Sequence, residues 1–234
     1  MRFGAIIQAR LSSQRCPGKV LKTVVEKPLL QYIIERLKQC DDIDSIVIAT
    51  STETSDNPIG SFCTNYNIPC MRGSLENVAG RFNDVLKHYP WDAFVRVNGD
   101  SPMIDQSLIK KGIDKFREDN FDIVTNVFPR SYPPGQSVEI IRSDTFRNTY
   151  PLMNKQEYFE HVTPYFYQNS QKFSIFNFHS EINYGNLHLA IDTPQDFQVF
   201  STIVSKMKAP HWEYHLSDIF EIIKDIKRTD PEDS

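Results

Sequence analysis

Short apolar runs that alternate with segments of helical periodicity constrain the fold of this 234-residue chain more than any other feature. Leu29, Ile33, Ile34 and Leu37 recur at helical spacing, whereas the run at 45–50 is too short for a helix and rich in β-branched residues. Over the first 125 residues, we expect strands at 2–8, 45–50, 68–71, 93–97 and 121–125, with helices between them. This alternation indicates βαβ units, so the sequence predicts an α/β fold with a Rossmann-like, mostly parallel sheet and helices on both faces.

The regular alternation of predicted strands and helices ends after residue 125. We expect strands at 137–141, 172–178 and 187–191, and helices at 144–149, 155–168, 197–207 and 216–226. Residues 130–135 are rich in proline and predict a loop. The sequence therefore predicts one domain over residues 1–234, with an arm inserted at about 127–180 and a frayed polar tail at 228–234.

Composition argues against several classes of protein. A net charge of −4 argues against a general nucleic-acid-binding protein, and an aromatic content of 12 % argues against a disordered chain. No apolar run approaches the roughly 20 residues of a membrane-spanning helix, and the N-terminus does not have the order of a signal peptide. We therefore expect a cytoplasmic protein without a membrane or nucleic-acid partner. The four cysteines form no CxxC pair, which argues against a zinc site.

The loop after the first predicted strand concentrates positive charge in an acidic chain. Residues 1–22 contain five basic residues and no acidic one, and Arg10, Arg15 and Lys19 lie in the polar loop 8–19. A loop at the carboxyl end of a buried strand can present such cations to several phosphate oxygens. The pattern indicates a phosphate-binding loop that differs from a Walker A loop, GxxxxGKS/T. A solvated basic turn is the alternative.

Two aspartates follow predicted strands, where a parallel sheet presents its ligands. Asp100 comes after the strand at 93–97, and Asp192 comes after the strand expected at 187–191. Mg²⁺ takes one or two protein carboxylates and completes its coordination with water and phosphates, so this pair suits a Mg²⁺ site. An aspartate before Ser-Pro or Thr-Pro is more often a turn or helix cap, and both readings stay open on the residues alone. Asp105 and Asp196 are expected to start helices.

Several motifs follow one another along the chain in a fixed order. Residues 8–19 read Gln-Ala-Arg-Leu-Ser-Ser-Gln-Arg-Cys-Pro-Gly-Lys, and further motifs lie at 27–30, 72–74, 98–102, 160–164 and 191–197. Together they resemble the CMP-sugar-acid synthetase family of cytidylyltransferases, and they are most similar to its branch of spore coat polysaccharide biosynthesis proteins. The resemblance covers nearly the whole chain.

This resemblance implies a transfer of CMP from CTP to a sugar, a sugar acid or a small phosphorylated acceptor, with release of pyrophosphate. The product would serve the biosynthesis of surface polysaccharides or glycoconjugates, and the cofactor would be Mg²⁺ or Mn²⁺. The resemblance also implies catalytic roles for Arg15, Lys19 and Asp100, a metal site at Asp100 and Asp192, and a homodimer formed through the arm at 127–180.

The resemblance also implies the remaining members of the site. The residues expected to contact the nucleotide are Gln8, Ala9, Arg10, Ser13, Arg15, Lys19, Arg72, Gly73, Ser74, Asn98 and Gly99. The residues expected to contact the acceptor are Arg96, Gln136, Glu139, Glu160 and His161.

The chain departs from the pattern of its relatives at two places. Where relatives tend to read Tyr-Pro-Asp-Gly-Leu-Asp-Val-Glu, Pro134 and Ser137 replace the two aspartates, which predicts a different and more anionic acceptor. Glu76 and Asn77 stand where relatives frequently have an acidic Asp-Val pair, which leaves the choice of CTP over another nucleotide open.

Three other functions stay open. A sugar-phosphate nucleotidyltransferase that uses another NTP would open with a glycine-rich loop, but no glycine lies between Gly4 and Gly18. A GT-A glycosyltransferase would have a DxD motif where residues 98–100 read Asn-Gly-Asp. A binding or scaffold protein without catalysis would not need cations such as Lys19 together with carboxylates such as Asp192.

Overall fold

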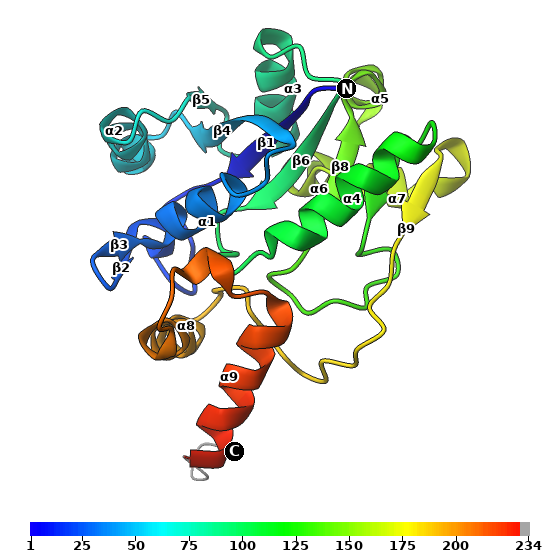
Figure 1. Cartoon of the computed structure of the whole chain (residues 1–234). Helices are drawn as coiled ribbons and strands as arrows, with labels where there is room; N and C mark the ends of the chain where they lie inside the picture. The colour runs from blue at the N-terminus through cyan, green and yellow to red at the C-terminus, as the bar shows by residue number, and fades with distance from the viewer. Residues whose placement is uncertain (230–234) are drawn as a thin grey trace.

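The computed structural model describes residues 1–229 (Figure 1). In this part of the chain a seven-stranded sheet has the order β5-β4-β1-β6-β8-β7-β9. Its strands are β1 (Phe3–Gln8), β4 (Ile43–Ser51), β5 (Cys70–Gly73), β6 (Ala93–Asn98), β7 (Ile123–Thr125), β8 (Glu139–Arg142) and β9 (Ile175–Asn177). Within this seven-stranded sheet only the two pairs that involve β8 are antiparallel, and the other pairs are parallel. The predicted mostly parallel sheet is confirmed.

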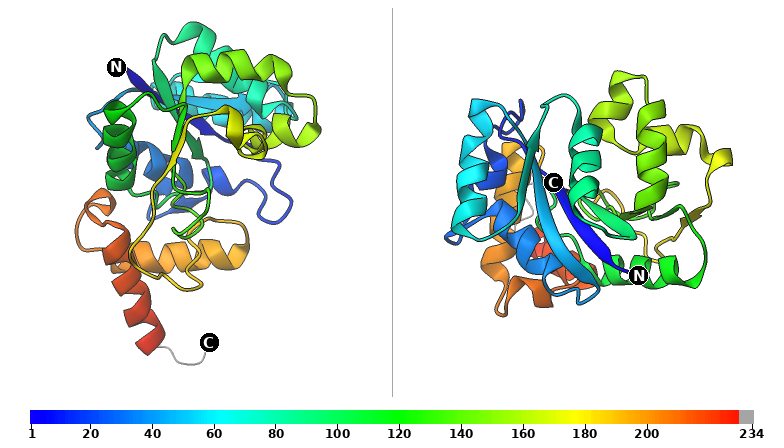
Figure 2. Two further views of the ribbon diagram at one scale, coloured as in Figure 1. Left: turned by 90° about the vertical axis from the view of Figure 1, so that its right-hand side faces the viewer. Right: turned by 90° about the horizontal axis from the view of Figure 1, so that it is seen from above.

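Helices cover both faces of this sheet (Figure 2). Along β1, Phe3, Ala5 and Ile7 pack into one apolar cluster and Ile6 packs into the other, because successive side chains of a strand point to opposite faces. The helices on the Phe3 face are α1 (Leu29–Leu37), α2 (Asn57–Asn65), α4 (Gln106–Glu118), α8 (Pro194–Lys206) and α9 (Leu216–Thr229). Those on the Ile6 face are α3 (Val78–His88), α5 (Ser143–Thr149), α6 (Gln156–His161) and α7 (Pro164–Gln168).

Side-chain caps begin three of these helices close to the strand ends. The Asn77 side chain accepts from Gly80 N–H at the start of α3, and the Asp105 side chain accepts from Ser107 N–H at the start of α4. At α8, Thr193 and Asp196 form a reciprocal capping box. The predicted helix-starting roles of Asp105 and Asp196 are confirmed. Each cap fixes the residue at which the preceding loop ends and the helix begins.

Two predicted elements are wrong. Residues 187–191 are not a strand, because Leu189 N–H donates to Pro134 O and Ile191 N–H donates to Asp100 O, so successive bonds go to two different loops. The single helix expected at 155–168 is divided into α6 and α7. Val162 between them has φ +70°, and Pro164 has no N–H with which to continue α6.

The segment 127–180 contributes strands β8 and β9 to the main sheet as well as helices α5 to α7. A two-stranded hairpin of β2 (Thr23–Val24) and β3 (Lys27–Pro28) precedes α1. Short 3-10 turns are η1 (Lys19–Leu21), η2 (Thr54–Asp56), η3 (Tyr150–Leu152), η4 (Ser170–Lys172) and η5 (His211–Glu213).

The C-terminal helix α9 continues to Thr229, so the first residues of the predicted frayed tail are helical. The rest of that tail, 230–234, lies outside the described residues. Among residues 1–229, no helix combines the length and the apolar character needed to cross a membrane.

Candidate functional site

A cavity of about 950 Å³ opens where β1 and β6 end. The loop after β1, the beginning of α3, the residues after β6, and α6 all contribute to its wall. Most of the predicted site residues line it: Gln8, Ala9, Arg10, Ser13, Arg15, Lys19, Asn98, Gly99, Asp100, Glu160, His161 and Asp192. The carboxyl ends of parallel strands are the usual ligand sites of such sheets, so this cavity is the candidate functional site.

The loop after β1 folds back on itself and returns Lys19 to the cavity. Leu11 N–H donates to Asp56 Oδ1 at 2.7 Å, and Gly18 N–H donates to Leu11 O at 3.0 Å. Gly18 has φ +70°, a left-handed conformation that glycine adopts at little cost. This turn starts η1, and Lys19 is its first residue.

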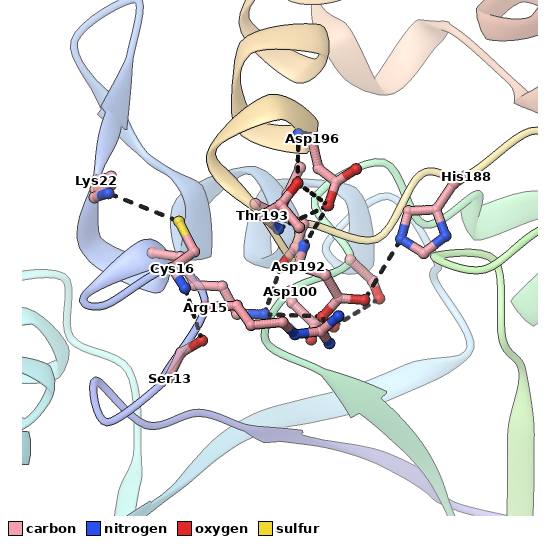
Figure 3. Close-up of polar contacts among 12 residues, drawn as sticks. Ser13, Arg15, Cys16, Lys22, Asp100, His188, Asp192, Thr193 and Asp196 are labelled. Carbon is pink, nitrogen blue, oxygen red and sulfur yellow. Dashed lines mark hydrogen bonds and ion pairs between the residues drawn. The ribbon is translucent and has the colours of Figure 1, made fainter.

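Lys19 joins the two predicted metal-binding aspartates. Its Nζ lies 3.1 Å from Asp100 Oδ2 and 3.6 Å from Asp192 Oδ1, and it also donates to Ile191 O. Arg15 Nη2 lies 3.0 Å from the same Asp192 oxygen (Figure 3). The Lys19 side chain is buried, whereas that of Arg15 is exposed. Two cations and two carboxylates from distant parts of the sequence therefore meet in one cluster.

Close packing of two strand ends sets the position of Asp100. Gly99 N–H donates to Gln8 O at 2.8 Å, and a Cβ on Gly99 would lie only 2.7 Å from that oxygen. A side chain at this position would therefore separate the ends of β1 and β6. Asp100 O in turn accepts from Ile191 N–H at 2.8 Å, which brings the segment before Asp192 to the same place.

Asp192 comes from a loop, and the cap of α8 holds its backbone. Asp196 Oδ2 accepts from Asp192 N–H at 2.9 Å and from Thr193 N–H at 2.7 Å (Figure 3). Burial alone would raise the pKa of Asp196, but these donors outweigh it and hold the pKa below its usual value. The charged Asp196 therefore fixes the backbone at 192–193 and leaves the Asp192 carboxylate to the cavity.

His188 belongs to this cluster, although its spacing gave no signal and the sequence indicates only a surface or packing histidine. His188 Nε2 lies 3.5 Å from Asp192 Oδ2, the oxygen that does not face Arg15 (Figure 3). Its place depends on the loop conformation of 185–192, which periodicity did not predict.

The cluster suits a hard divalent cation that also binds phosphate. Asp100 and Asp192 both contact the Lys19 ammonium group, so their carboxylates converge on one cation position. Among residues 1–229 no group of three or more His, Cys, Asp or Glu side chains is arranged to hold a metal ion. Two carboxylates are the usual protein share of a Mg²⁺ site that is completed by water and substrate phosphates, so the residues fit Mg²⁺.

The opposite wall of the cavity comes from the segment 127–180. Glu160 and His161 lie at the end of α6 and line the cavity. Glu160 Oε1 lies 3.6 Å from Arg10 Nη2, so this helix contacts the loop after β1 directly. Both side chains are partly exposed, and the pair therefore contributes little to stability.

Arg96 and Glu139 lie behind the cavity and do not line it. They form a buried ion pair, and Arg96 Nε also donates to Gln8 Oε1 at 3.1 Å. Tyr167 OH donates to Glu139 Oε1 at 2.7 Å. Burial alone would raise the pKa of Glu139, but Arg96 and Tyr167 outweigh it and lower the pKa. Through these contacts the charged pair holds the Gln8 side chain in place and connects β6 to β8 and α7.

Gln136 also lies away from the cavity, in the interior. Its Oε1 accepts from Asp105 N–H at 2.9 Å, and its Nε2 donates to Met103 O at 2.6 Å. The side chain therefore bridges the loop before α4 to the segment 132–139, and both ends of its amide group are engaged.

Arg72, Gly73 and Ser74 lie beside the cavity without lining it. The Arg72 guanidinium donates to Ser51 O at 2.8 Å and to Glu53 O at 3.1 Å, which fastens β5 to β4. The wall at this end is formed by Leu75, Glu76, Val78 and Arg81. The sequence did not single out Arg81, because an arginine on a helix with ordinary periodicity gives no sign of being buried.

The chain is similar to known proteins over most of its length. The protein-family model described as cytidylyltransferase matches residues 4–228. An uncharacterised protein of Methanocaldococcus jannaschii is 32 % identical over 202 residues, which cover 86 % of this chain and 82 % of that protein. The spore coat polysaccharide biosynthesis protein SpsF of Bacillus subtilis is 27 % identical over 208 residues, which cover 86 % and 85 %.

A solved structure agrees over the full length. The structure of a cytidylyltransferase from Leptospira borgpetersenii serovar Hardjo-bovis superposes with a TM-score of 0.92 at 27 % identity, covering all of this chain and 98 % of that one. The fold prediction is therefore confirmed by both the topology and this similarity.

Proposed function

Because this chain belongs to the cytidylyltransferase family and is a nucleotidyltransferase, we propose that it transfers CMP from CTP to a sugar, a sugar acid or a small phosphorylated acceptor. The observation that carries the proposal is the cluster of Arg15, Lys19, Asp100 and Asp192 in the cavity. Such a cluster can hold a triphosphate together with a divalent cation.

In the proposed reaction an oxygen of the acceptor attacks the α-phosphorus of CTP. A new O–P bond forms, the bond between the α-phosphorus and the bridging oxygen breaks, and pyrophosphate leaves. Positioning and charge stabilisation supply most of the catalysis in such transfers. Arg15 and Lys19 would neutralise the leaving pyrophosphate, and Arg10 and Ser13 would contact phosphate oxygens from the same loop.

Asp100 and Asp192 would hold the divalent cation, Mg²⁺ or Mn²⁺. Bound there, the cation would neutralise charge on the phosphate oxygens. The Lys19 ammonium and the Arg15 guanidinium neutralise the same carboxylates in this structure. Cation binding at the aspartates would therefore free both side chains for the triphosphate.

We propose that the acceptor binds between the phosphate loop and α6, where Glu160 and His161 line the cavity. Arg96, Glu139 and Gln136 would act indirectly, by holding Gln8 and the segment 132–139 in place. The name of the Bacillus subtilis relative supports an acceptor from surface polysaccharide biosynthesis. We also propose a homodimer through the segment 127–180, which the mass of the protein in solution would test.

The proposal is tested by pyrophosphate release from CTP, UTP, ATP and GTP, each with Mg²⁺ and a panel of sugars, sugar acids and phosphorylated acceptors. We expect release from CTP, its loss with a chelator, and its recovery with Mg²⁺ or Mn²⁺. Asp100→Asn and Asp192→Asn should each reduce the rate by about 10²–10³, the usual effect of removing a charge-stabilising group.

Asp114→Asn is the matched control, because Asp114 is an exposed carboxylate on α4 that pairs with Lys110 at 3.2 Å. It should leave the rate unchanged. Turnover of UTP, ATP or GTP in preference to CTP would indicate a sugar-phosphate nucleotidyltransferase instead. Transfer from a nucleotide sugar would indicate a glycosyltransferase, and the absence of both turnover and nucleotide binding would indicate a scaffold protein.

A further inference from the structure

One buried cation in the cavity wall has no role in the reaction described above. Arg81, the fourth residue of α3, is 2 % exposed and lines the cavity. Within residues 1–229 no carboxylate lies within ion-pair distance of its guanidinium group. Asp56 acts on it only at longer range, and the Asp56 carboxylate accepts from Leu11 N–H and the Ser51 hydroxyl. A buried charge without a counter-ion is costly, which points to a ligand that completes its environment.

Within residues 1–229, both hydrogen bonds of the Arg81 side chain come from Nη1, one of its three nitrogen atoms. Its Nη1 donates to Ser74 O at 2.7 Å and to Leu75 O at 3.2 Å. Its Nε is buried and has no partner. Burial lowers the pKa of Arg81 to about 10, so the group stays charged at neutral pH. The cavity wall therefore contains a cationic guanidinium group with unused hydrogen-bonding capacity, beside the Leu75 carbonyl that the same side chain holds in place.

The place of Arg81 in the fold matches one end of a nucleotide. The carbonyls that it binds follow β5, and the metal-binding cluster follows β6. In the sheet order, β4 and β1 lie between β5 and β6. Neighbouring strands are about 4.8 Å apart, so the carboxyl ends of β5 and β6 are roughly 14 Å apart. A triphosphate at β6 would carry its base toward β5. Leu75 and Val78 give that end an apolar surface on which a base can lie.

We propose that Arg81 is a specificity-determining residue that selects cytosine over uracil. The inference rests on the proposed function, since it concerns the base of the same nucleotide. The Watson–Crick edge of cytosine has a donor at N4 and acceptors at N3 and O2. The Arg81 guanidinium donates to N3 and O2, and the carbonyl of Leu75, a residue that lines the cavity, accepts from N4.

Uracil reverses two of these groups. Its O4 would face the Leu75 carbonyl oxygen, and its N3–H would face the guanidinium donor, so both contacts become repulsive. A site built to pair with a polar group discriminates strongly against a ligand that leaves it unpaired. Discrimination therefore follows from one side chain that both donates to the base and positions the acceptor beside it.

The experiment measures the affinities of CTP, UTP and inorganic tripolyphosphate by titration calorimetry with Mg²⁺. The proteins are the wild type, Arg81→Lys and the control Arg147→Lys. Arg147 on α5 also donates to a backbone carbonyl of α3, Leu86 O at 3.0 Å, but it does not line the cavity. We expect the wild type to bind CTP at least 10²-fold more tightly than UTP.

In Arg81→Lys the ratio of CTP to UTP affinity should fall by 10- to 100-fold, while tripolyphosphate binds as before. Arg147→Lys should keep the wild-type ratio. A second measurement covers the case in which Arg81→Lys does not fold. The wild type should bind 3-deaza-CTP, which has C–H in place of N3, at least 10-fold more weakly than CTP.

Three outcomes would overturn the assignment of Arg81 alone: a wild type without preference for CTP, an unchanged ratio in Arg81→Lys, or equal binding of CTP and 3-deaza-CTP. Equal weakening of all three ligands in Arg81→Lys would assign the residue to phosphate binding and would also overturn it. A wild type that binds no nucleotide would instead overturn the proposed function, and the assignment with it.

Discussion

The ammonium group of Lys19 faces three oxygens, those of Asp100, Asp192 and the Ile191 carbonyl. Its removal leaves two neighbouring carboxylates with one cation fewer and takes a positive charge from the proposed leaving-group site. We therefore expect Lys19→Ala to reduce CTP-dependent pyrophosphate release by about 10²–10³. The measurement is the rate at saturating CTP, together with the melting temperature of the variant.

Lys22→Ala is the matched control for this change. Lys22 belongs to the same loop region, but its Nζ contacts Cys16 Sγ at 3.7 Å and does not line the cavity (Figure 3). It should change the rate by less than about threefold, as expected of a cation outside the reacting groups. Equal losses in the two variants would mean that the loop needs general positive charge, and the specific role of Lys19 would be wrong.

The sequence predicted the cavity residues whose position follows from the local pattern, and it missed those whose position follows from burial. The loop 8–19 was recognised by its basic residues, and Asp100 by its position directly after a predicted strand. Arg81 and His188 become visible only when α3 and the loop 185–192 are placed in three dimensions. Gln136 shows the opposite error. The resemblance implied that it contacts the acceptor, but its amide group bonds to Asp105 N–H and Met103 O inside the protein.

At the scale of elements, the sequence predicts strands and helices well where periodicity is local and poorly where the partners are distant. Strand β1 lies within one residue of its predicted bounds, and helix α1 spans the apolar residues that recur at helical spacing, from Leu29 to Leu37. Residues 187–191 have the composition of a strand, but their hydrogen bonds go to Pro134 and Asp100. Which loop a backbone N–H will meet is a property of the tertiary fold, and periodicity carries no information about it.

Gly135 is the position at which this loop depends most on its partner. It has φ +93°, and a Cβ there would lie 2.4 Å from the Leu189 carbonyl carbon. Gly135→Ala should therefore reduce the free energy of unfolding by about 3 kcal/mol, through backbone strain and overlap. It should also lower pyrophosphate release by more than 10-fold, because the displaced segment ends at Asp192. Urea unfolding and the CTP assay measure the two effects.

Gly185→Ala separates the two causes. Gly185 also has a positive φ, +59°, but nothing lies within 4 Å of the position of its Cβ. This variant should lose only the conformational term of about 1–2 kcal/mol and keep its activity. If Gly135→Ala behaved in the same way, the contact with residues 189–190 would have no part in holding the site.

At the scale of the whole molecule, a buried polar network fastens the C-terminal helices to the sheet domain. Arg36 on α1 is fully buried and donates to His211 O at 2.5 Å and to Tyr214 O at 3.0 Å. Asp105 Oδ2 accepts from Leu216 N–H at 2.8 Å. These bonds anchor the first residue of α9, which then reaches away from the sheet (Figure 1).

His211 makes this attachment sensitive to pH. Its Nε2 bonds to Glu35 Oε2 at 2.8 Å, while its Nδ1 is buried and has no partner. Burial lowers the pKa of His211 to about 4; Glu35 opposes this shift, and Arg36 and Lys27 add to it. A proton on Nδ1 would create a buried donor without an acceptor, so the folded protein keeps the ring neutral.

The sign of the pH effect follows from the two protonation states. Between its unfolded pKa, near 6.5, and about 4, His211 binds a proton in the unfolded chain but not in the folded one. The free energy of unfolding should therefore fall as the pH is lowered, by about 2 kcal/mol between pH 7 and pH 5.

His211→Gln, which keeps a donor for Glu35 but does not titrate, should lose about 2 kcal/mol less than the wild type over this interval. Urea unfolding at the two pH values measures the difference, with His88→Gln as a control at an exposed histidine of α3 that should follow the wild type. Parallel losses in the wild type and His211→Gln would show that another group is responsible for the pH dependence.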